Sequence, residues 1–278
     1  MNRSDLFFTV SLFLHLTAFG QSRSLAKTRD SIHNSVAAIL RQDTSGGTFI
    51  GASGVLIHPR VILTAGHVNF SNFKQLPGGC STKGWVSFSD KAYSGVERYA
   101  FDYAHGIESY PDTAAFAKSF GDTTGQAGPS HFIDIGLIFL DEPVRGHPVM
   151  QLPDTSFLKD NVGDSSLLGA GYGYHTRMDS TFTFSSIDGL RRTWTPRMSL
   201  YNDKWLFAQC DPISNLPYLC IADSGSPLLF RNKMVVGVWS FEGYGKAPCP
   251  YSSWAVRLDN PDALSWIKAT IQRRLGNK

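Results

Sequence analysis

The stretch GVLIHPRVILTAGHV, residues 54–68, decides the fold class of this chain. It holds two apolar, β-branched runs on either side of a Pro-containing turn, and small residues then lead into a single histidine, His67. Apolar runs of this length, bounded by turn residues, predict strands over 49–57 and 60–65.

The same pattern of short apolar runs and turns continues along the chain. We expect further strands at 36–40, 84–88, 133–140, 165–172, 205–209, 228–241 and 254–258. Strands without alternating helices predict an all-β barrel or sandwich. One helix is expected over 260–275, with Asn260 as N-cap and Pro261 at its first position. The Gly-, Asp- and Thr-rich stretch 93–128 is expected to hold a long surface loop.

Composition and charge narrow the class of protein. The 278 residues are 42% apolar and 18% charged, which suits a globular protein with a real core rather than a disordered tail. The 26 basic and 23 acidic side chains give a net charge of only +3, without a run of four Lys or Arg. Nucleic acid is therefore not an expected partner.

The N-terminus predicts export. Arg3 precedes an apolar run over 6–19, and small residues at Ala18 and Gly20 suit cleavage before Gln21. Residues 1–20 are thus interpreted as a signal peptide. A membrane anchor is the alternative, but this run would reach only about 21 Å across a hydrocarbon core of roughly 30 Å. We expect a secreted protein, extracellular or periplasmic, without membrane attachment after cleavage.

Three separated segments carry residue types that can do chemistry. They are TAGH ending at His67, DIGLIFL beginning at Asp134, and ADSGSP around Ser224. Each is ambiguous alone, since a His after a strand or an Asp-Ser-Gly turn is common. Asp102, Asp112 and Asp122 are rival carboxylates, but Asp134 alone leads into an apolar strand.

Together these segments closely resemble the three signature blocks of the chymotrypsin/trypsin-like serine peptidases. GAGYG at 169–173, VGVWSF at 236–241 and the C-terminal helix add to the resemblance, which covers nearly the whole mature chain. RLDNP at 257–261 is similar to the ends of secreted bacterial members. The resemblance implies two six-stranded antiparallel β-barrels, at about 33–148 and 149–258, followed by the helix.

The resemblance also implies a role for each segment. His67, Asp134 and Ser224 would form a Ser-His-Asp triad that hydrolyses peptide bonds through an acyl-enzyme. The backbone N–H groups of Ala222 and Ser224 would form the oxyanion hole, where the family usually has glycine at the first position. Neither a cofactor nor a metal is expected, and C-x-x-C and H-E-x-x-H spacings are absent.

The cysteines match the family only in part. Counting alone leaves three pairings open for Cys80, Cys210, Cys220 and Cys249. By resemblance, Cys220 and Cys249 would form the disulfide that frames the specificity pocket, whereas Cys80 and Cys210 either bond each other or stay free. The disulfide that brackets the catalytic histidine in many members would fall at Ala52 and Val68, so both of its halves are missing.

The substrate-binding residues follow by position in the resemblance. They would be Tyr218, Leu219, Ser240, Phe241, Glu242 and Ser253. Tyr218 replaces the acid expected of a trypsin, so cleavage after Lys or Arg is not predicted. Glu242 is interpreted as a solvated rim residue in preference to a group that selects basic substrates. Asp223 has as possible partners the new N-terminus at Gln21 or a buried arginine.

These observations predict a monomeric, secreted serine endopeptidase that acts on proteins or peptides. Two alternatives stay open. A peptidase-fold protein with impaired catalysis could act as a binding module, which Ala222 favours. An esterase with the same triad is weaker, and the absence of Gly-x-Ser-x-Gly disfavours an α/β-hydrolase.

Overall fold

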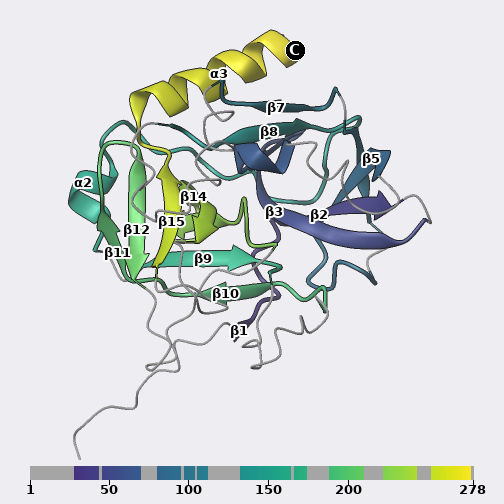
Figure 1. The fold of residues 1–278 in the computed structure, drawn as a ribbon, viewed down its shortest axis with the longest axis horizontal. Coiled ribbons are helices and arrows are strands. Elements are labelled where there is room, and N and C mark those ends of the chain that lie inside the picture. Colours follow the sequence, from purple (N-terminus) through teal and green to yellow (C-terminus); the bar gives the residue numbers. More distant parts are fainter. Residues whose placement is uncertain are drawn as a thin grey trace, which may run out of the picture.

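A computed structural model of the chain describes ten segments of the sequence. These are residues 28–43, 46–69, 80–94, 97–103, 105–111, 132–163, 166–173, 188–209, 222–242 and 252–276. Within them lie two antiparallel sheets that each curl on themselves, and a long helix at the C-terminus. Figure 1 shows β2, β3 and β5 on one side of the molecule and β12, β14 and β15 on the other.

The first sheet has seven strands in the order β6-β5-β2-β3-β4-β8-β7. Their bounds are β2 (Val36–Asp43), β3 (Thr48–His58), β4 (Val61–Thr64), β5 (Cys80–Ser87), β6 (Tyr99–Asp102), β7 (Ile107–Ser109) and β8 (Gly136–Phe139). A short 3-10 helix, η1 (Gly66–Asn69), follows β4. All four residues of both β4 and β8 are buried, so the middle of this sheet forms core on both faces.

The second sheet has eight strands in the order β1-β10-β9-β13-β14-β15-β12-β11. Their bounds are β1 (Thr28–Arg29), β9 (Leu167–Gly171), β10 (Arg192–Trp194), β11 (Met198–Leu200), β12 (Trp205–Gln209), β13 (Pro227–Phe230), β14 (Met234–Glu242) and β15 (Ser252–Arg257). A one-turn helix, α2 (Leu158–Asn161), precedes β9. Trp205 and Trp239 are both at most 1% exposed and anchor the apolar core of this sheet.

The expected all-β fold with two curled halves is confirmed, and each strand expected from an apolar run is present. The sheets have seven and eight strands rather than six each, because the short strands β1, β7 and β11 add to their edges. Residues 93–128 were expected to hold a long surface loop, and of this stretch the structure describes residues 93–94, 97–103 and 105–111. β6 and β7 lie there, each paired with a neighbouring strand of the first sheet.

The expected C-terminal helix is confirmed as α3 (Pro261–Leu275), drawn in yellow across the top of Figure 1. The side chain of Asn260 caps it by accepting hydrogen bonds from the backbone N–H groups of Asp262 and Ala263. Leu264 and Ile267 are buried on its inner face. Among the described residues, no helix combines the length and apolar character needed to span a membrane.

Candidate active site

His67 and Asp134 come together because two neighbouring strands place them at the same end of the first sheet. β4 pairs antiparallel with β8, and Thr64 lies opposite Gly136. His67 follows the end of β4 in η1, and Asp134 precedes the start of β8. Sixty-seven residues of chain separate the two side chains, but the pairing of their strands makes them neighbours.

The carboxylate of Asp134 is fully buried and accepts three hydrogen bonds. Its Oδ2 accepts from the Nδ1 of His67 at 2.6 Å and from the hydroxyl of Ser240 at 2.5 Å, while its Oδ1 accepts from the backbone N–H of His67 at 2.8 Å. Donation by Nδ1 places the imidazole proton on that atom, so Nε2 is left with a lone pair. The side chain of His67 remains 21% exposed and can reach a bound molecule.

The backbone beside His67 is held by two further side chains. The carbonyl of Val68 accepts a hydrogen bond from the guanidinium of Arg41 at 2.5 Å and another from the hydroxyl of Tyr103. Arg41 is buried, and its guanidinium carbon lies 4.5 Å from the centre of the Tyr103 ring. These contacts hold η1 at Val68, which is the position where the resemblance to the family would place one cysteine of a disulfide.

Ser224 lies in a tight turn between the two sheets, just before β13. The backbone N–H of Gly225 donates to the carbonyl of Trp239 at 2.7 Å, and that of Ser226 donates to the carbonyl of Asp223 at 2.8 Å. The hydroxyl of Ser224 donates to the carbonyl of Ser240, 3.3 Å away. Ser240 therefore touches both Asp134 and Ser224, which brings the two halves of the site together.

Two residues of the Ser224 turn have left-handed backbone, and only one of them is glycine. Ala222 has a φ of 72° and Gly225 a φ of 83°. A Cβ on Gly225 would lie 2.0 Å from the Thr64 hydroxyl oxygen and 2.2 Å from the Ser53 carbonyl oxygen, so a side chain has no room there. Ala222 carries its Cβ at a cost of about 1–2 kcal/mol relative to an ordinary conformation. The position where the family usually has glycine is therefore strained in this backbone.

A buried ion pair lies beside the paired strands β1 and β10 of the second sheet, where the chain passes on to the first sheet. The guanidinium of Arg191 is fully buried; it donates to Asp30 at 2.7 Å and to the carbonyl of Phe88 at 2.8 Å. Asp30 also accepts from the Nδ1 of His33 at 2.9 Å. Burial alone would raise the pKa of Asp30, but the hydrogen bonds from His33 and the Ile32 backbone, with the charge of Arg191, hold it far below its usual range.

The same contacts act on His33 in the opposite sense. Burial by itself would lower the pKa of His33, but the hydrogen bond to Asp30, the interaction with Asn232 and the charge of the Asp30 carboxylate together outweigh this, and the pKa is raised above the usual 6.5. Arg191 pairs with Asp30 and is therefore not a buried arginine that pairs with Asp223. Asp223 accepts from the backbone N–H of Gly173 at 3.0 Å and is fully buried.

The structure brings together part of the residue set expected from the sequence. His67, Asp134, Ser224, Ala222 and Ser240 meet in one place, as the contacts above show. Ser253 is buried on β15, opposite Glu242 of β14 in the strand register. Of Phe241 and Glu242 only the backbone is described. The expected signal peptide, Tyr218, Leu219 and the expected Cys220–Cys249 disulfide lie outside the described residues, as does Cys210; of Cys80 only the backbone is described.

Two hydrogen bonds of the site were not predicted from the sequence. The first is the bond from the Ser240 hydroxyl to Asp134, while the expected part of Ser240 in substrate binding stays a prediction. The second is Ser53 on β3, whose hydroxyl donates to the carbonyl of Ala222 at 3.0 Å. A buried serine in the middle of an apolar strand is a signal that could have singled it out, because a buried hydroxyl needs partners.

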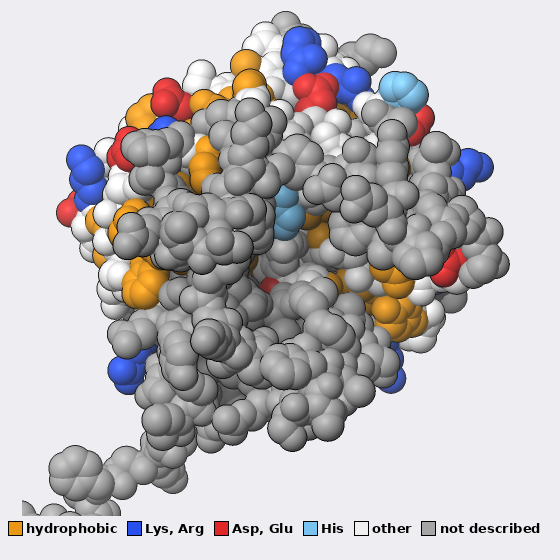
Figure 2. Space-filling model, in the orientation of Figure 1, with side chains coloured by type: hydrophobic (Ala, Val, Ile, Leu, Met, Phe, Trp, Pro, Cys, Tyr) orange, Lys and Arg blue, Asp and Glu red, His pale blue; other side chains and the backbone are white. Residues whose placement is uncertain are grey.

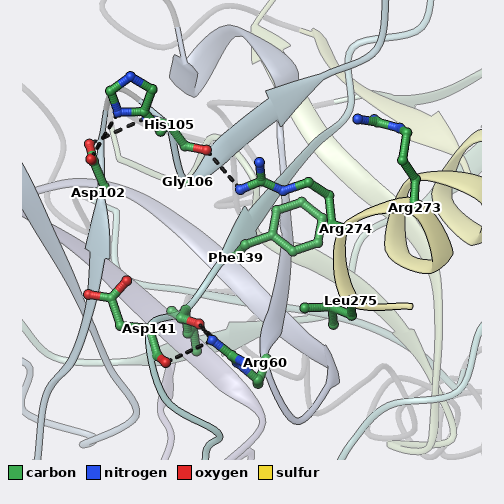
Figure 3. A pocket seen from close by; sticks show the side chains of 10 residues that line it. Arg60, Asp102, His105, Gly106, Phe139, Asp141, Arg273, Arg274 and Leu275 are labelled. Carbon is green, nitrogen blue, oxygen red and sulfur yellow. Dashed lines mark hydrogen bonds and ion pairs between the residues drawn. The ribbon is translucent and has the colours of Figure 1, made fainter. Parts of the chain in front are cut away.

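A separate pocket of about 490 Å³ lies at the other end of β4 and β8, where Val61 pairs with Phe139. Figure 3 shows the guanidinium of Arg274 over the ring of Phe139, and Arg60 hydrogen-bonded to the backbone of Asp141. Asp102 faces the same space. Acidic and basic groups are thus mixed around this pocket. The pocket lies at one end of β4 and β8, and His67 and Asp134 lie at the opposite end.

Charges of both signs are also mixed on the described surface. Figure 2 shows Lys and Arg side chains beside Asp and Glu side chains along the margin of one face. A cluster of three or more His, Cys, Asp or Glu side chains suited to a metal ion is absent from the described parts of the chain. At the site, the described residues supply an imidazole, a buried carboxylate and a serine hydroxyl.

Comparison with known proteins agrees with the fold described above. The Trypsin family model matches residues 28–267, while a search of curated proteins gave no match. HL collagenase, solved at 1.7 Å, is 15% identical with a TM-score of 0.58, and the alignment covers 91% of this chain and 98% of that chain. The scabies mite inactivated protease paralogue S-D1 is 14% identical with a TM-score of 0.62, covering 90% and 97%.

A further solved structure, of Glu endopeptidase in complex with MPD, is 15% identical with a TM-score of 0.55, and the alignment covers 88% of this chain and 96% of that chain. At such identities the structural likeness shows the chymotrypsin-like fold, and the family model shows the relationship. The chain belongs to the trypsin family.

Proposed function

We propose that this protein is a serine endopeptidase in which Ser224 is the nucleophile, His67 the general base and Asp134 the residue that orients it. The observation that carries the proposal is the buried Asp134 carboxylate, which is hydrogen-bonded to the Nδ1 of His67 at 2.6 Å beside the Ser224 turn. A buried carboxylate, an imidazole and a serine in this order match the triad of acyl-transfer enzymes.

The first chemical step would use the lone pair on the Nε2 of His67. Asp134 holds the proton on Nδ1, so Nε2 accepts the hydroxyl proton of Ser224 as its oxygen bonds to the substrate carbonyl carbon. The imidazolium that forms carries a positive charge, and the buried carboxylate stabilises it. The Ser240 hydroxyl, which also donates to Asp134, keeps that carboxylate in place.

The next steps would pass through an acyl-enzyme. The N–H groups of Ala222 and Ser224 donate to the developing oxyanion, and each such donor typically contributes about 3 kcal/mol to the transition state. Collapse of the intermediate breaks the C–N bond, and Nε2 returns its proton to the leaving amine. Water then attacks the ester on Ser224 with His67 again as base, which releases the acid and restores the enzyme.

The substrates we propose are proteins or peptides that reach the enzyme outside the cytoplasm after removal of residues 1–20. Tyr218, Leu219, Phe241, Glu242 and Ser253 would line the binding pocket, framed by a Cys220–Cys249 disulfide. The likeness to secreted bacterial members and the monomeric state belong to the same proposal. The apolar run at 6–19 and the positional match to family motifs support it.

The test is modification of the purified mature protein by an organofluorophosphonate, followed by intact mass measurement. We expect one adduct on the wild type, and none on Ser224→Ala or His67→Ala, because the reaction needs an activated serine. The mass also gives the N-terminus and the number of disulfides. Wild-type labelling of a folded Ser224→Ala protein would refute the assignment of the nucleophile.

A second candidate function is supported by the backbone at Ala222. The family usually has glycine at this position, and here an alanine is held at a φ of 72°. If this strain keeps the oxyanion hole from forming, the protein would be a binding module with a peptidase fold. A folded wild type that does not react with the fluorophosphonate, and an Ala222→Gly variant that does, would favour this function over catalysis.

A further inference from the structure

The strained alanine of the Ser224 turn is held from the opposite sheet by one buried serine. Ser53, on β3, is fully buried. Its hydroxyl donates to the carbonyl of Ala222 at 3.0 Å, and its backbone N–H donates to the carbonyl of Ser224 at 2.9 Å. Ser53 therefore contacts the carbonyls of both residues whose N–H groups would form the oxyanion hole.

The hydroxyl of Ser53 is itself fixed in direction. It accepts a hydrogen bond from the backbone N–H of Tyr172 at 3.0 Å, so its own proton is directed to the carbonyl of Ala222. The carbonyl of Ser53 is fixed as well, since the hydroxyl of Thr64 donates to it at 2.8 Å. A serine with every polar group in use, inside an apolar strand, acts as a rigid support for the turn.

This support acts on the backbone angle that alanine disfavours. An alanine at φ 72° tends to relax to a negative φ, which would rotate a neighbouring peptide and move the Ala222 N–H away from the substrate oxygen. The hydrogen bond from Ser53 holds the carbonyl of Ala222, so it opposes a relaxation in which Ala222 turns together with the peptide that follows it. A glycine would not need the support, because it takes positive and negative φ about equally.

We propose that Ser53 is a positioning residue that keeps Ala222 in the left-handed conformation and the oxyanion hole in its working form. The proposal rests on the proposed peptidase function. It implies that the effects of Ala222 and Ser53 are coupled, because a hydroxyl from the opposite sheet offsets the loss of the usual glycine. Ser53 acts through Ala222 and does not touch the substrate.

The test is a double-mutant cycle on Ser53→Ala and Ala222→Gly. The measurement is the limiting rate of modification of Ser224 by an organofluorophosphonate, together with the half-saturating concentration. We expect Ser53→Ala to lower the limiting rate about 3- to 10-fold, the effect of one net hydrogen bond, and to leave the half-saturating concentration unchanged. In the Ala222→Gly protein the same change should lower the rate less than about 2-fold.

Ser226→Ala is the matched control. Ser226 is as buried as Ser53 and lies in the same turn, but its hydroxyl has no hydrogen-bond partner among the described residues. Loss of that hydroxyl should leave the limiting rate at the wild-type value. An equal slowing by Ser53→Ala in the alanine and glycine proteins would overturn the proposal, because the hydroxyl would then not act through Ala222.

Failure of the proposed peptidase function would give a different result from failure of the proposal about Ser53. If none of the four proteins reacts, the peptidase assignment fails, and the same cycle is then measured on the free energy of unfolding in denaturant. A smaller destabilisation by Ser53→Ala in the glycine protein than in the alanine protein supports the coupling without any catalysis. Equal destabilisation in both proteins overturns it.

Discussion

The two halves of the candidate site are built in different ways. The His67 half is held by side chains, since Asp134 accepts from Ser240 and His67, and the carbonyl of Val68 accepts from Arg41 and Tyr103. The Ser224 half is held mainly by backbone, through hydrogen bonds of the turn and left-handed residues at 222 and 225. The base should therefore be sensitive to single side-chain changes, and the nucleophile to changes that alter backbone angles.

A third region sets the position of one half relative to the other. Arg191 precedes β10 of the second sheet; its guanidinium pairs with Asp30, next to β1 of the same sheet, and reaches the carbonyls of Val36 and Phe88 on the first-sheet side. Because these groups are buried, they contribute only when all partners are in place. We expect changes here to act first on stability, and on activity only as a consequence.

The largest effect should come from Asp134→Asn in the His67 half. An amide can donate to Nδ1 and so favour the wrong tautomer of His67, and in serine peptidases of this family the equivalent change lowers kcat about 10⁴-fold. The measurement is turnover of a protein substrate together with circular dichroism of the folded variant. Asp102→Asn is the control, since Asp102 is an exposed carboxylate paired with His105. Comparable losses from both variants would contradict the assignment of Asp134.

The next effect concerns the region between the halves. Asp30→Asn leaves the buried guanidinium of Arg191 without its carboxylate, and such a loss typically costs about 4 kcal/mol. The free energy of unfolding in urea measures it. Asp90→Asn is the control, because its ion pair with Arg29 is largely exposed and should contribute at most about 1 kcal/mol. A loss of less than about 1 kcal/mol for Asp30→Asn would contradict the prediction.

The pKa shifts of Asp30 and His33 predict how the free energy of unfolding depends on pH. The pKa of Asp30 is lowered on folding, so its contribution is present above the usual aspartate range, near 4, and is lost as the pH falls. The pKa of His33 is raised, so its contribution is present below about 6.5 and is lost as the pH rises through the raised value. The combined contribution is largest between about pH 4 and 6.5, and Asp30→Asn should flatten the profile at both ends.

Only part of the fold and of the candidate site could be predicted from the sequence. Strands such as β3, β4 and β8 follow from apolar runs, and the three motif segments indicate His67, Asp134 and Ser224. The short strands β1, β6 and β7 have only two to four residues and exist through their pairing, so their own sequences carry little signal. Ser53 and Arg41 act through contacts 169 and 27 residues away along the chain, which no local pattern encodes.

The smallest effect should come from Tyr103→Phe, which removes one of the two donors to the carbonyl of Val68. Arg41 still donates to that carbonyl, so it is not left unpaired, and the cost should be about 1 kcal/mol, or roughly a fivefold fall in kcat. The measurement is kcat against pH, with KM determined in parallel. A change in kcat at constant KM indicates a shifted His67, since the substrate pocket would be untouched.

Tyr201→Phe completes this experiment, because Tyr201 is 50% exposed and loses only a surface hydroxyl. It should keep the wild-type kcat. The side-chain network around His67 predicts that Tyr103→Phe slows turnover while the Ser224 turn is unchanged. If instead Tyr103→Phe and Tyr201→Phe behave alike, then Arg41 alone fixes the loop, and the His67 half would depend on fewer side chains than its hydrogen bonds imply.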